Sequence, residues 1–342
     1  AANAPWSKAI HSGRVSAGEV NRQSISITFG EELGKVDPDL VKPEEGWFEW
    51  KPDPAAQGPD EVSLAQWLDA PAGKHGRIFA KGDRLEVNGK PIRLWGINLC
   101  YQDCAPPKDL AERRAAFYAR NGINAVRLHK YADGPGWAGI QSPESFTEFD
   151  PQALDRMDYF VAQLKAKGIY VKLSPTFGVK LGPKDYDQLP FAKDFGPRPA
   201  PGNRLETKHG AVYLSTEIQN LQIRQTTNLL KHRNPYTGLT YAEDPAIFLV
   251  EMYNEDSALF YGTMERLQNV PALRAKAGVE FVHWLRDKYK TKEALLARWG
   301  ADSLNTFAGE RITGESWEDW RIFPVGNPWF FDPDQLAGSQ AA

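Results

Sequence analysis

Two stretches of the sequence decide its fold: Gly-Ile-Asn-Ala-Val-Arg-Leu-His at residues 122–129 and Gly-Ile-Tyr-Val-Lys-Leu at residues 168–173. Each begins with a glycine that ends a helical pattern and continues as an apolar, β-prone run. Because this helix-to-strand junction occurs twice, it predicts repeated βα units. Near-continuous apolar strands between helices are typical of a parallel sheet covered by helices.

The same alternation extends to both sides of these stretches. Apolar runs at 94–99 and 246–253 predict two further strands, and helical spacing predicts helices from Leu110, from Pro151 and from Leu214. In the first helix the spacing predicts a packed face of Leu110, Arg113, Ala116 and Phe117. A barrel and a doubly wound sheet both fit this pattern. No glycine-rich nucleotide fingerprint follows any strand, which disfavours nucleotide binding.

The chain divides into two predicted parts. Residues 1–83 lack helical periodicity and form an irregular or β-rich appendage, with β-prone pieces at 24–29 and 47–50. The (β/α) barrel portion is expected over 84–342. It begins with a hairpin, because residues 84–87 alternate between polar and apolar side chains and Asn88-Gly89 is a strong turn signal.

The length of the chain limits how much of a barrel it can hold. A complete (β/α)8 TIM barrel needs about 250 residues, yet the fourth expected strand already reaches Tyr253, and the remainder looks helical. We therefore predict an α/β chain with only the first four to five units of a (β/α)8 barrel. Unpaired edge strands promote association, so a second segment or chain is expected to complete the barrel.

Composition excludes several classes of partner. The formal charge is −3, from 41 basic and 44 acidic side chains, which gives no bulk field for nucleic acid or an anionic membrane. No apolar run approaches the ~18 residues of a membrane span. The 11 Trp, 12 Tyr and 17 Phe suit a protein that binds ring-shaped ligands. The first residues, Ala-Ala-Asn-Ala, are compatible with a cleaved signal and favour a secreted or periplasmic location.

Metal and thiol chemistry are not expected. Cys100 and Cys104 are too few for a disulfide scaffold or a four-cysteine zinc site, and two free thiols are predicted, a bridge remaining open in an oxidising compartment. The histidines at positions 75, 209, 232 and 283 are scattered along the sequence without metal-ligand spacing. We predict no metal and no cofactor.

Polar side chains gather where the predicted strands end, which is where parallel α/β folds place their chemistry. They are Asn98, Arg127 with His129, Lys172 with Ser174, and Asn254-Glu255-Asp256. Glu255 follows the most apolar run. A carboxyl at the mouth of an apolar barrel has a raised pKa and can act as a general acid, while the neighbouring amide of Asn254 can hold a substrate hydroxyl.

On these residues the chain resembles the clan A glycoside hydrolases, which include family 5 cellulase- and mannanase-like and family 42 galactosidase-like enzymes. The matching motifs are Arg-Leu-Trp-Gly-Ile-Asn at 93–98, Gly-Ile-Asn-Ala-Val-Arg at 122–127, Asp-Pro-Ala at 244–246 and Asn-Glu at 254–255. The resemblance covers roughly residues 84–325. It implies a (β/α)8 barrel that hydrolyses the β-glycosidic bonds of a carbohydrate with retention of configuration.

The resemblance also implies roles for individual residues. Glu255 would be the acid/base, Asn254 would bind the sugar 2-hydroxyl, Arg127 would support the nucleophile, and His129 would line the cleft. In the clan the nucleophile is a Glu that ends the seventh strand, ~5–5.5 Å from the acid/base. No late Glu of this chain ends an apolar strand, so the nucleophile is expected beyond this chain.

Two long loops are expected to supply further substrate contacts. Residues 131–149 form one of them and offer Trp137 and Phe146. Trp137 is a candidate substrate-binding residue, because aromatic faces stack on sugar rings, and Asn98 at the end of the first strand is a candidate polar contact. Residues 175–212 form a second long loop, of the kind that usually serves function or is disordered. Its aromatic residues are Phe177, Tyr186, Phe191 and Phe195.

Other interpretations stay open. Glu251 is expected to form an ion pair with Arg127 or Arg93, and Lys172 is expected to be an interior ion pair. A non-catalytic carbohydrate-binding half-barrel is one alternative. Another is a different barrel enzyme, such as an aldolase that uses Lys172 as a Schiff base.

Overall fold

The computed structural model describes residues 62–258, 261–305 and 313–324, all within the unit formed by residues 53–342. The β-prone pieces at 24–29 and 47–50 lie outside the described residues. The expected boundary between residues 83 and 84 stays a prediction.

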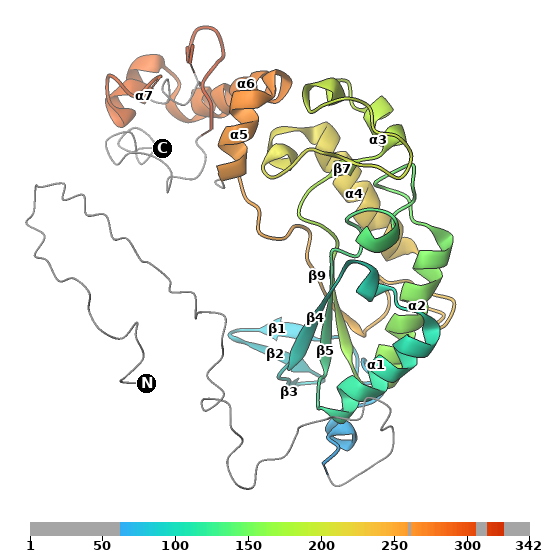
Figure 1. Ribbon diagram of the computed structural model, residues 1–342. Helices are drawn as coiled ribbons and strands as arrows, with labels where there is room; N and C mark the ends of the chain where they lie inside the picture. Colours follow the sequence, from blue (N-terminus) through green and yellow to red (C-terminus); the bar gives the residue numbers. More distant parts are fainter. Residues whose placement is uncertain (1–61, 259–260, 306–312, 325–342) are drawn as a thin grey trace, which may run out of the picture. The chain divides into compact units, whose positions relative to one another are not determined.

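The centre of the fold is a parallel sheet of four strands whose spatial order equals their chain order. The strands are β4 (Gly96–Cys100), β5 (Ala125–His129), β6 (Tyr170–Ser174) and β9 (Ile247–Val250). They are connected by α1 (Lys108–Arg120), α2 (Pro151–Ala166) and α4 (Thr216–Lys231), which lie on the same side of the sheet (Figure 1). A doubly wound sheet would reverse its strand order and carry helices on both faces. The predicted first units of a (β/α) barrel are confirmed.

The two faces of this sheet differ in chemistry. Val126, Leu128, Val171 and Leu173 are fully buried in the main apolar core with the helices. The other face carries Asn98, Arg127 and Lys172 side by side, because the register pairs Asn98 with Arg127 and Arg127 with Lys172. This polar face is the one that a closed barrel would turn inward.

The first helix packs through a different face from the one the spacing predicts. Its buried residues are Ala111, Ala115, Tyr118 and Ala119, so the predicted face is wrong by about one position. Alanines let the helix axis approach the sheet closely, whereas the larger Leu110 and Phe117 are only partly buried at its margin. The second helix begins as expected, with the Asp150 side chain accepting from Ala153 N at 2.8 Å ahead of Pro151.

The chain before the sheet forms a small antiparallel sheet. Its strands are β1 (Phe79–Lys81), β2 (Arg84–Val87) and β3 (Lys90–Pro91), preceded by the 3-10 turn η3 (Ala65–Trp67). Val87 pairs with Lys90, which confirms the predicted hairpin. Two backbone hydrogen bonds attach this region to the ends of α1 and α2. They run from Leu64 N to Arg120 O and from Ala72 N to Lys165 O, each at 2.8 Å.

The stretch at 175–212 is ordered, contrary to the expectation of a structureless loop. It forms β7 (Lys180–Leu181), α3 (Pro183–Gln188), η6 (Ala192–Asp194), β8 (Leu205–Glu206) and η7 (Ala211–Leu214). Val179, Leu181 and Phe191 build a second core with Phe146 of the preceding loop and Ile218 of α4. These apolar residues do not alternate at helical or strand spacing, so periodicity alone does not reveal them.

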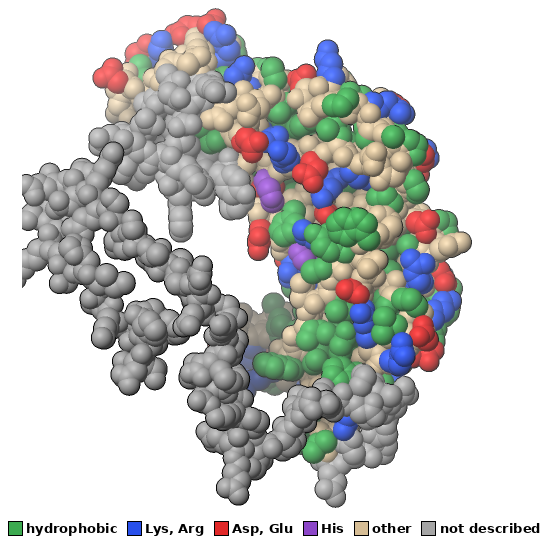
Figure 2. Space-filling model, viewed as in Figure 1, with side chains coloured by type: hydrophobic (Ala, Val, Ile, Leu, Met, Phe, Trp, Pro, Cys, Tyr) green, Lys and Arg blue, Asp and Glu red, His purple; other side chains and the backbone are tan. Residues whose placement is uncertain are grey.

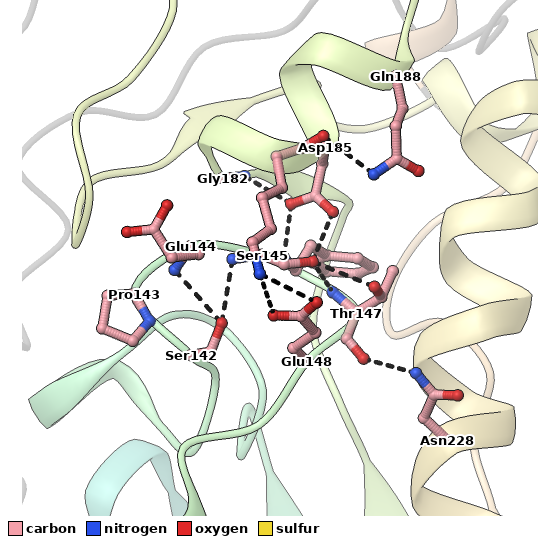
Figure 3. A network of polar contacts seen from close by, with 12 residues as sticks. Ser142, Pro143, Glu144, Ser145, Thr147, Glu148, Gly182, Asp185, Gln188 and Asn228 are labelled. Atoms are coloured by element: carbon pink, nitrogen blue, oxygen red, sulfur yellow. Dashed lines mark hydrogen bonds and ion pairs between the residues drawn. The ribbon is translucent and has the colours of Figure 1, made fainter.

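Asp185 ties this stretch to the loop after β5 (Figure 3). Its carboxylate is fully buried and accepts from Ser145 Oγ at 2.7 Å, Phe146 N at 2.6 Å and Gly182 N at 2.8 Å. These bonds join the two loops, which are also linked by the Arg204 guanidinium, whose Nε donates to Gln141 Oε1 at 3.2 Å, and by the backbone bond from Lys184 N to Glu144 O at 3.1 Å. The two joined loops lie beside the carboxyl ends of the strands (Figure 1).

Replacing Asp185 by asparagine is expected to destabilise the protein by about 1–3 kcal/mol, because the amide nitrogen that replaces one carboxylate oxygen faces a buried donor and cannot accept a hydrogen bond from it. Urea unfolding measures the loss, and hydrogen exchange should show faster opening of the Phe146 amide. Asp187→Asn is the matched control, since the Asp187 carboxylate is half exposed on the same helix. Equal stability of the two variants would show that the hydrogen bonds accepted by Asp185 do not hold the two loops together.

The described residues after β9 form helices and add no strand to the parallel sheet. The helices are α5 (Tyr261–Asn269), α6 (Pro271–Tyr289) and α7 (Lys292–Trp299). Leu285 of α6 and Leu295 of α7 are fully buried in a separate core with Trp317 and Ile322. The helical character expected after residue 254 is confirmed.

Candidate active site

Backbone conformation marks the carboxyl ends of the strands. Tyr101 follows β4, Lys130 follows β5, and Glu255 lies in the turn after β9, with φ of +57°, +55° and +47°. This left-handed region is uncommon for residues other than glycine. Such strained residues concentrate at functional sites, where surrounding contacts hold them. Three of the eight non-glycine residues with positive φ in the described part of the chain therefore lie at the edge where the sequence predicts the site.

An ion-pair network around Glu251 occupies the polar face of the sheet at this edge. Glu251 Oε2 lies 2.6 Å from Arg127 Nη2, and Oε1 lies 2.9 Å from Lys172 Nζ. Ser174 Oγ also donates to Oε2. Burial acts to raise the pKa of Glu251, but the hydrogen bonds from Ser174, Lys172 and Arg127 outweigh it and lower the pKa to about 2.

Both predicted ion pairs of this network are confirmed. Glu251 pairs with Arg127, one of its two expected partners, and Lys172 pairs with Glu251. A Schiff-base lysine must lose its proton to become a nucleophile. The Lys172 amine is engaged by the Glu251 carboxylate at 2.9 Å and does not stand free to attack a carbonyl, which argues against the aldolase interpretation.

Asn254 is connected to the same network. Its side chain is buried, and its Oδ1 accepts from Arg127 Nη2. Because the guanidinium can only donate, the Asn254 carbonyl oxygen must face Arg127. Its Nδ2 then remains to donate to a bound hydroxyl, as the expected role requires.

Glu255 projects from a firmly held turn. Asp256, the next residue, has a buried carboxyl whose Oδ2 accepts from Gly210 N at 3.0 Å, and burial raises its pKa. Tyr213 donates its hydroxyl to the Asp256 carbonyl at 3.0 Å. Glu255 itself is exposed, so the described residues do not supply the desolvation that its expected acidity needs.

His129 is a neutral neighbour of this network. Its Nδ1 lies 2.9 Å from Ser174 Oγ, and its ring meets Phe177 edge-on at 5.2 Å between centroids. Burial, together with the positive charges of Arg127 and Lys130, lowers the pKa of His129 to about 4. At neutral pH it can orient hydroxyl groups but carries no charge.

The low pKa of His129 predicts acid sensitivity. Unfolded His129 binds a proton below its ordinary pKa of 6.5, but the folded ring does so only near 4, so stability is lost as pH falls through this window. Urea unfolding at pH 7 and pH 4.5 should show a loss on the order of 1–3 kcal/mol from this residue. His129→Gln should flatten the profile, whereas His75→Gln, at an exposed histidine, should not. Parallel profiles for all three proteins would refute the assignment.

The remaining candidate residues lie at the margin of the network. Asn98 is exposed beside Arg127 on the neighbouring strand, with its Nδ2 3.3 Å from Cys100 Sγ. Trp137 is 68% exposed and its ring centroid lies 5.2 Å from that of Tyr101. Of the loop aromatics, Phe177 reaches the site. Phe191 and Phe195 pack against each other at 6.3 Å in the second core.

Tyr101 and Lys130 belong to the site but were not singled out from the sequence. Lys130 Nζ lies 2.7 Å from the Tyr101 hydroxyl. The signal that could have found them is their position, each directly after an apolar strand. A left-handed backbone at a tyrosine or a lysine has no such signature in composition or spacing.

Among the described residues, no three His, Cys, Asp or Glu side chains gather as a metal site. Cys100 and Cys104 are both free thiols, as predicted. Charged side chains of both signs are mixed over the face drawn in Figure 2. None of the described helices is long and apolar enough to span a bilayer.

Together these observations define the described residues as part of a (β/α) barrel whose polar side chains converge at the carboxyl ends of its strands. Comparison with known proteins finds similar sequences among curated plant proteins. The chain is 24% identical over 198 residues to mannan endo-1,4-beta-mannosidase 2 of Arabidopsis thaliana, covering 56% of this chain and 43% of that protein. It is 25% identical over 195 residues to mannan endo-1,4-beta-mannosidase 4 of Oryza sativa subsp. japonica, covering 55% and 40%. The expected resemblance to clan A glycoside hydrolases is confirmed over this part of the chain, with relatives named as endo-1,4-beta-mannosidases.

The comparisons match only part of the chain and part of its relatives. No family model matches the chain, and the chain spans less than half the length of these curated relatives. Among solved structures, an endo-1,4-beta-mannanase from Rhizomucor miehei has a TM-score of 0.41 at 17% identity, covering 62% of this chain and 58% of that one. A family 5 mannosidase from the same organism has a TM-score of 0.36 at 12% identity, covering 77% and 59%.

Proposed function

We propose that this chain provides the acid/base half of a retaining glycoside hydrolase that cleaves β-1,4-linked polysaccharides of the mannan type. The observation that carries the proposal is the hydrogen bond from Arg127 to Asn254, which aims an amide donor from the residue before Glu255. The curated relatives, named as endo-1,4-beta-mannosidases, support the substrate class.

In the proposed mechanism, Glu255 first gives its proton to the glycosidic oxygen as a carboxylate nucleophile attacks the anomeric carbon. The carbon–oxygen bond to the leaving sugar breaks while the bond to the nucleophile forms. Ionised Glu255 then removes a proton from water, which attacks the anomeric carbon and releases the enzyme carboxylate. Asn254 Nδ2 donates to a sugar hydroxyl throughout and fixes the ring.

The nucleophile is proposed to come from a segment or chain that completes the barrel. Glu251 does not fit the role, because Lys172 engages one of its oxygens and Arg127 with Ser174 engage the other. Arg127 keeps a buried Nε without a hydrogen-bond partner among the described residues, which suits a further carboxylate. Within the parallel sheet described here, β4 pairs only with β5 and β9 only with β6, so both edges can accept strands.

We also propose a secreted or periplasmic location, since a polysaccharide cannot cross a membrane to reach its enzyme. The non-catalytic alternative is favoured by one observation, the exposure of Glu255. A completed barrel would bury this carboxyl and a carbohydrate-binding half-barrel would not.

The test is the intact mass of the full-length protein after incubation with 2-fluoro-mannosides and 2-fluoro-glucosides, which trap the covalent intermediate of a retaining enzyme. A mass gain of one glycosyl group, mapped by peptide digestion, is the expected result and names the nucleophile. Hydrolysis with inverted product configuration would overturn the retaining mechanism. Mannan binding without turnover or trapping would establish the non-catalytic alternative instead.

A further inference from the structure

We propose that Lys130 binds an oxyanion carried by the glycan, so that the preferred substrate is an acidic or acid-decorated polysaccharide. This inference rests on the proposed function and adds a specificity-determining residue to its site. The acidic group would be the carboxylate of a uronic acid or the sulfate of a sugar ester, which share the chemistry that an ammonium recognises.

Lys130 lines a cavity of about 280 Å³ next to the candidate active site. Other residues around this cavity are Phe177, Lys180, Glu206, Lys208 and His209. His209 Nδ1 lies 3.9 Å from Asp256 Oδ2, one residue beyond Glu255. A sugar held near Glu255 can therefore place a substituent in this cavity.

The ammonium of Lys130 is positioned without being neutralised. Its Nζ lies 4.1 Å from the centre of the Phe177 ring and 4.9 Å from that of Tyr101, and it donates to the Tyr101 hydroxyl at 2.7 Å. Aromatic faces attract a cation but do not cancel its charge. No carboxylate of the described residues forms an ion pair with Lys130.

The other lysines of the cavity differ from Lys130 in this respect. Lys180 Nζ lies 2.7 Å from Asp133 and 3.4 Å from Glu206, and Lys208 Nζ lies 3.9 Å from Glu265. Each therefore has a carboxylate partner. Lys130 alone among these three lysines has a charge left for a ligand.

The backbone conformation of Lys130 directs its side chain toward the candidate site. Lys130 is held at φ +55°, although a lysine gains nothing intrinsic from a left-handed conformation. The Lys130 N to Ser174 O bond of 2.8 Å holds this conformation. The consequence is that the side chain turns off the end of β5 toward Tyr101 and Phe177, at the edge where the substrate is expected.

The cavity suits one oxyanion rather than a run of them. Glu206 and Glu265 also line it, and their half-exposed carboxylates would repel a second negative group. A neutral hydroxyl would leave the Lys130 charge uncompensated, whereas an oxyanion would form a charge-assisted hydrogen bond with it.

The test compares matched β-1,4-linked mannan oligosaccharides in the full-length protein. One is neutral, one carries a single uronic acid, one carries the methyl ester of that acid, and one carries a sulfate ester. The acidic ligand is expected to bind roughly tenfold more tightly than its methyl ester, with the preference falling as salt rises. If the sulfate ester binds as tightly as the uronic acid, the site accepts any oxyanion. If the sulfate ester binds no better than the neutral ligand, the site is specific for carboxylates.

Variants separate this role from a structural one. Lys130→Met should bring the ratio of the acidic to the methyl-ester affinity down to about one, and Lys130→Arg should retain the preference. Lys193→Met, at an exposed lysine of η6, is the matched control. Equal loss of neutral and acidic binding in Lys130→Met, with a lowered Tm, would show a structural role and overturn the proposal.

The wild-type protein distinguishes the two levels of inference. Binding of neutral mannan oligosaccharide with no acid preference would refute the role of Lys130 and leave the proposed function intact. No binding of any of the four ligands would refute both.

Discussion

Replacing Glu255 by glutamine is expected to lower kcat/KM for an unactivated polysaccharide roughly 10²–10⁴-fold, the contribution of a positioned general acid/base. Glutamine keeps the size and the hydrogen-bonding reach of the side chain but cannot release a proton. Because Glu255 is exposed, the variant should keep the stability of the parent. Reducing-sugar release from mannan measures the loss, and urea unfolding checks the stability.

The leaving group gives this prediction its sharpest form. An aryl glycoside that releases nitrophenolate needs no protonation, so its glycosylation step should be affected far less by Glu255→Gln than that of mannan. Added azide, which attacks the intermediate without base assistance, should then restore turnover. Glu148→Gln, at a half-exposed carboxylate paired with Lys184, is the control. Equal losses on mannan and the aryl glycoside, without rescue by azide, would show that Glu255 is not the acid/base.

The strands and their order were predictable because their signals are local. Residues 125–129 and 170–174 are apolar runs that follow a glycine-terminated helix, and the structure makes both of them strands of one parallel sheet. The N-cap of α2 at Asp150 and the hairpin at Asn88-Gly89 are equally local, and both are present. Periodicity and turn chemistry are enough for such features.

What the sequence could not predict depends on contacts between distant residues. The packed face of α1 depends on how closely alanines let it approach the sheet. The order of 175–212 depends on its apolar core and on its contacts with the loop after β5, among them the hydrogen bond from Ser145 Oγ to Asp185. The Arg127–Asn254 hydrogen bond joins residues 127 positions apart in the chain. Local spacing can place each of these residues at a strand end, but it cannot pair them.

The ion pairs of Glu251 explain how the polar face of the sheet is stable before any substrate is present. Arg127 and Lys172 are neighbours on adjacent strands, and two cations in such positions repel each other. A carboxylate between them turns this repulsion into two attractions. It also keeps Arg127 directed toward Asn254, so the stability of the network and the geometry of the site depend on the same residue.

Replacing Glu251 by alanine is therefore expected to destabilise the protein by about 2–3 kcal/mol at pH 7, somewhat less than the loss of a fully buried partner, because Arg127 and Lys172 keep partial contact with water. Glu251→Gln should lose less, since it retains hydrogen bonds without the charge. Adding Lys172→Met to Glu251→Ala should recover part of the loss by removing one of the two unpaired cations, and a double-mutant cycle measures this coupling.

The pH dependence identifies the charge as the cause. The Glu251 carboxyl has its ordinary pKa of 4.5 in the unfolded chain and about 2 in the folded one, so its contribution is present above pH 4.5 and is lost as pH falls toward 2. The difference in unfolding free energy between the parent and Glu251→Ala should shrink over that window. A difference that stays constant from pH 7 to pH 3 would show that packing, and not the ionised carboxylate, accounts for the effect.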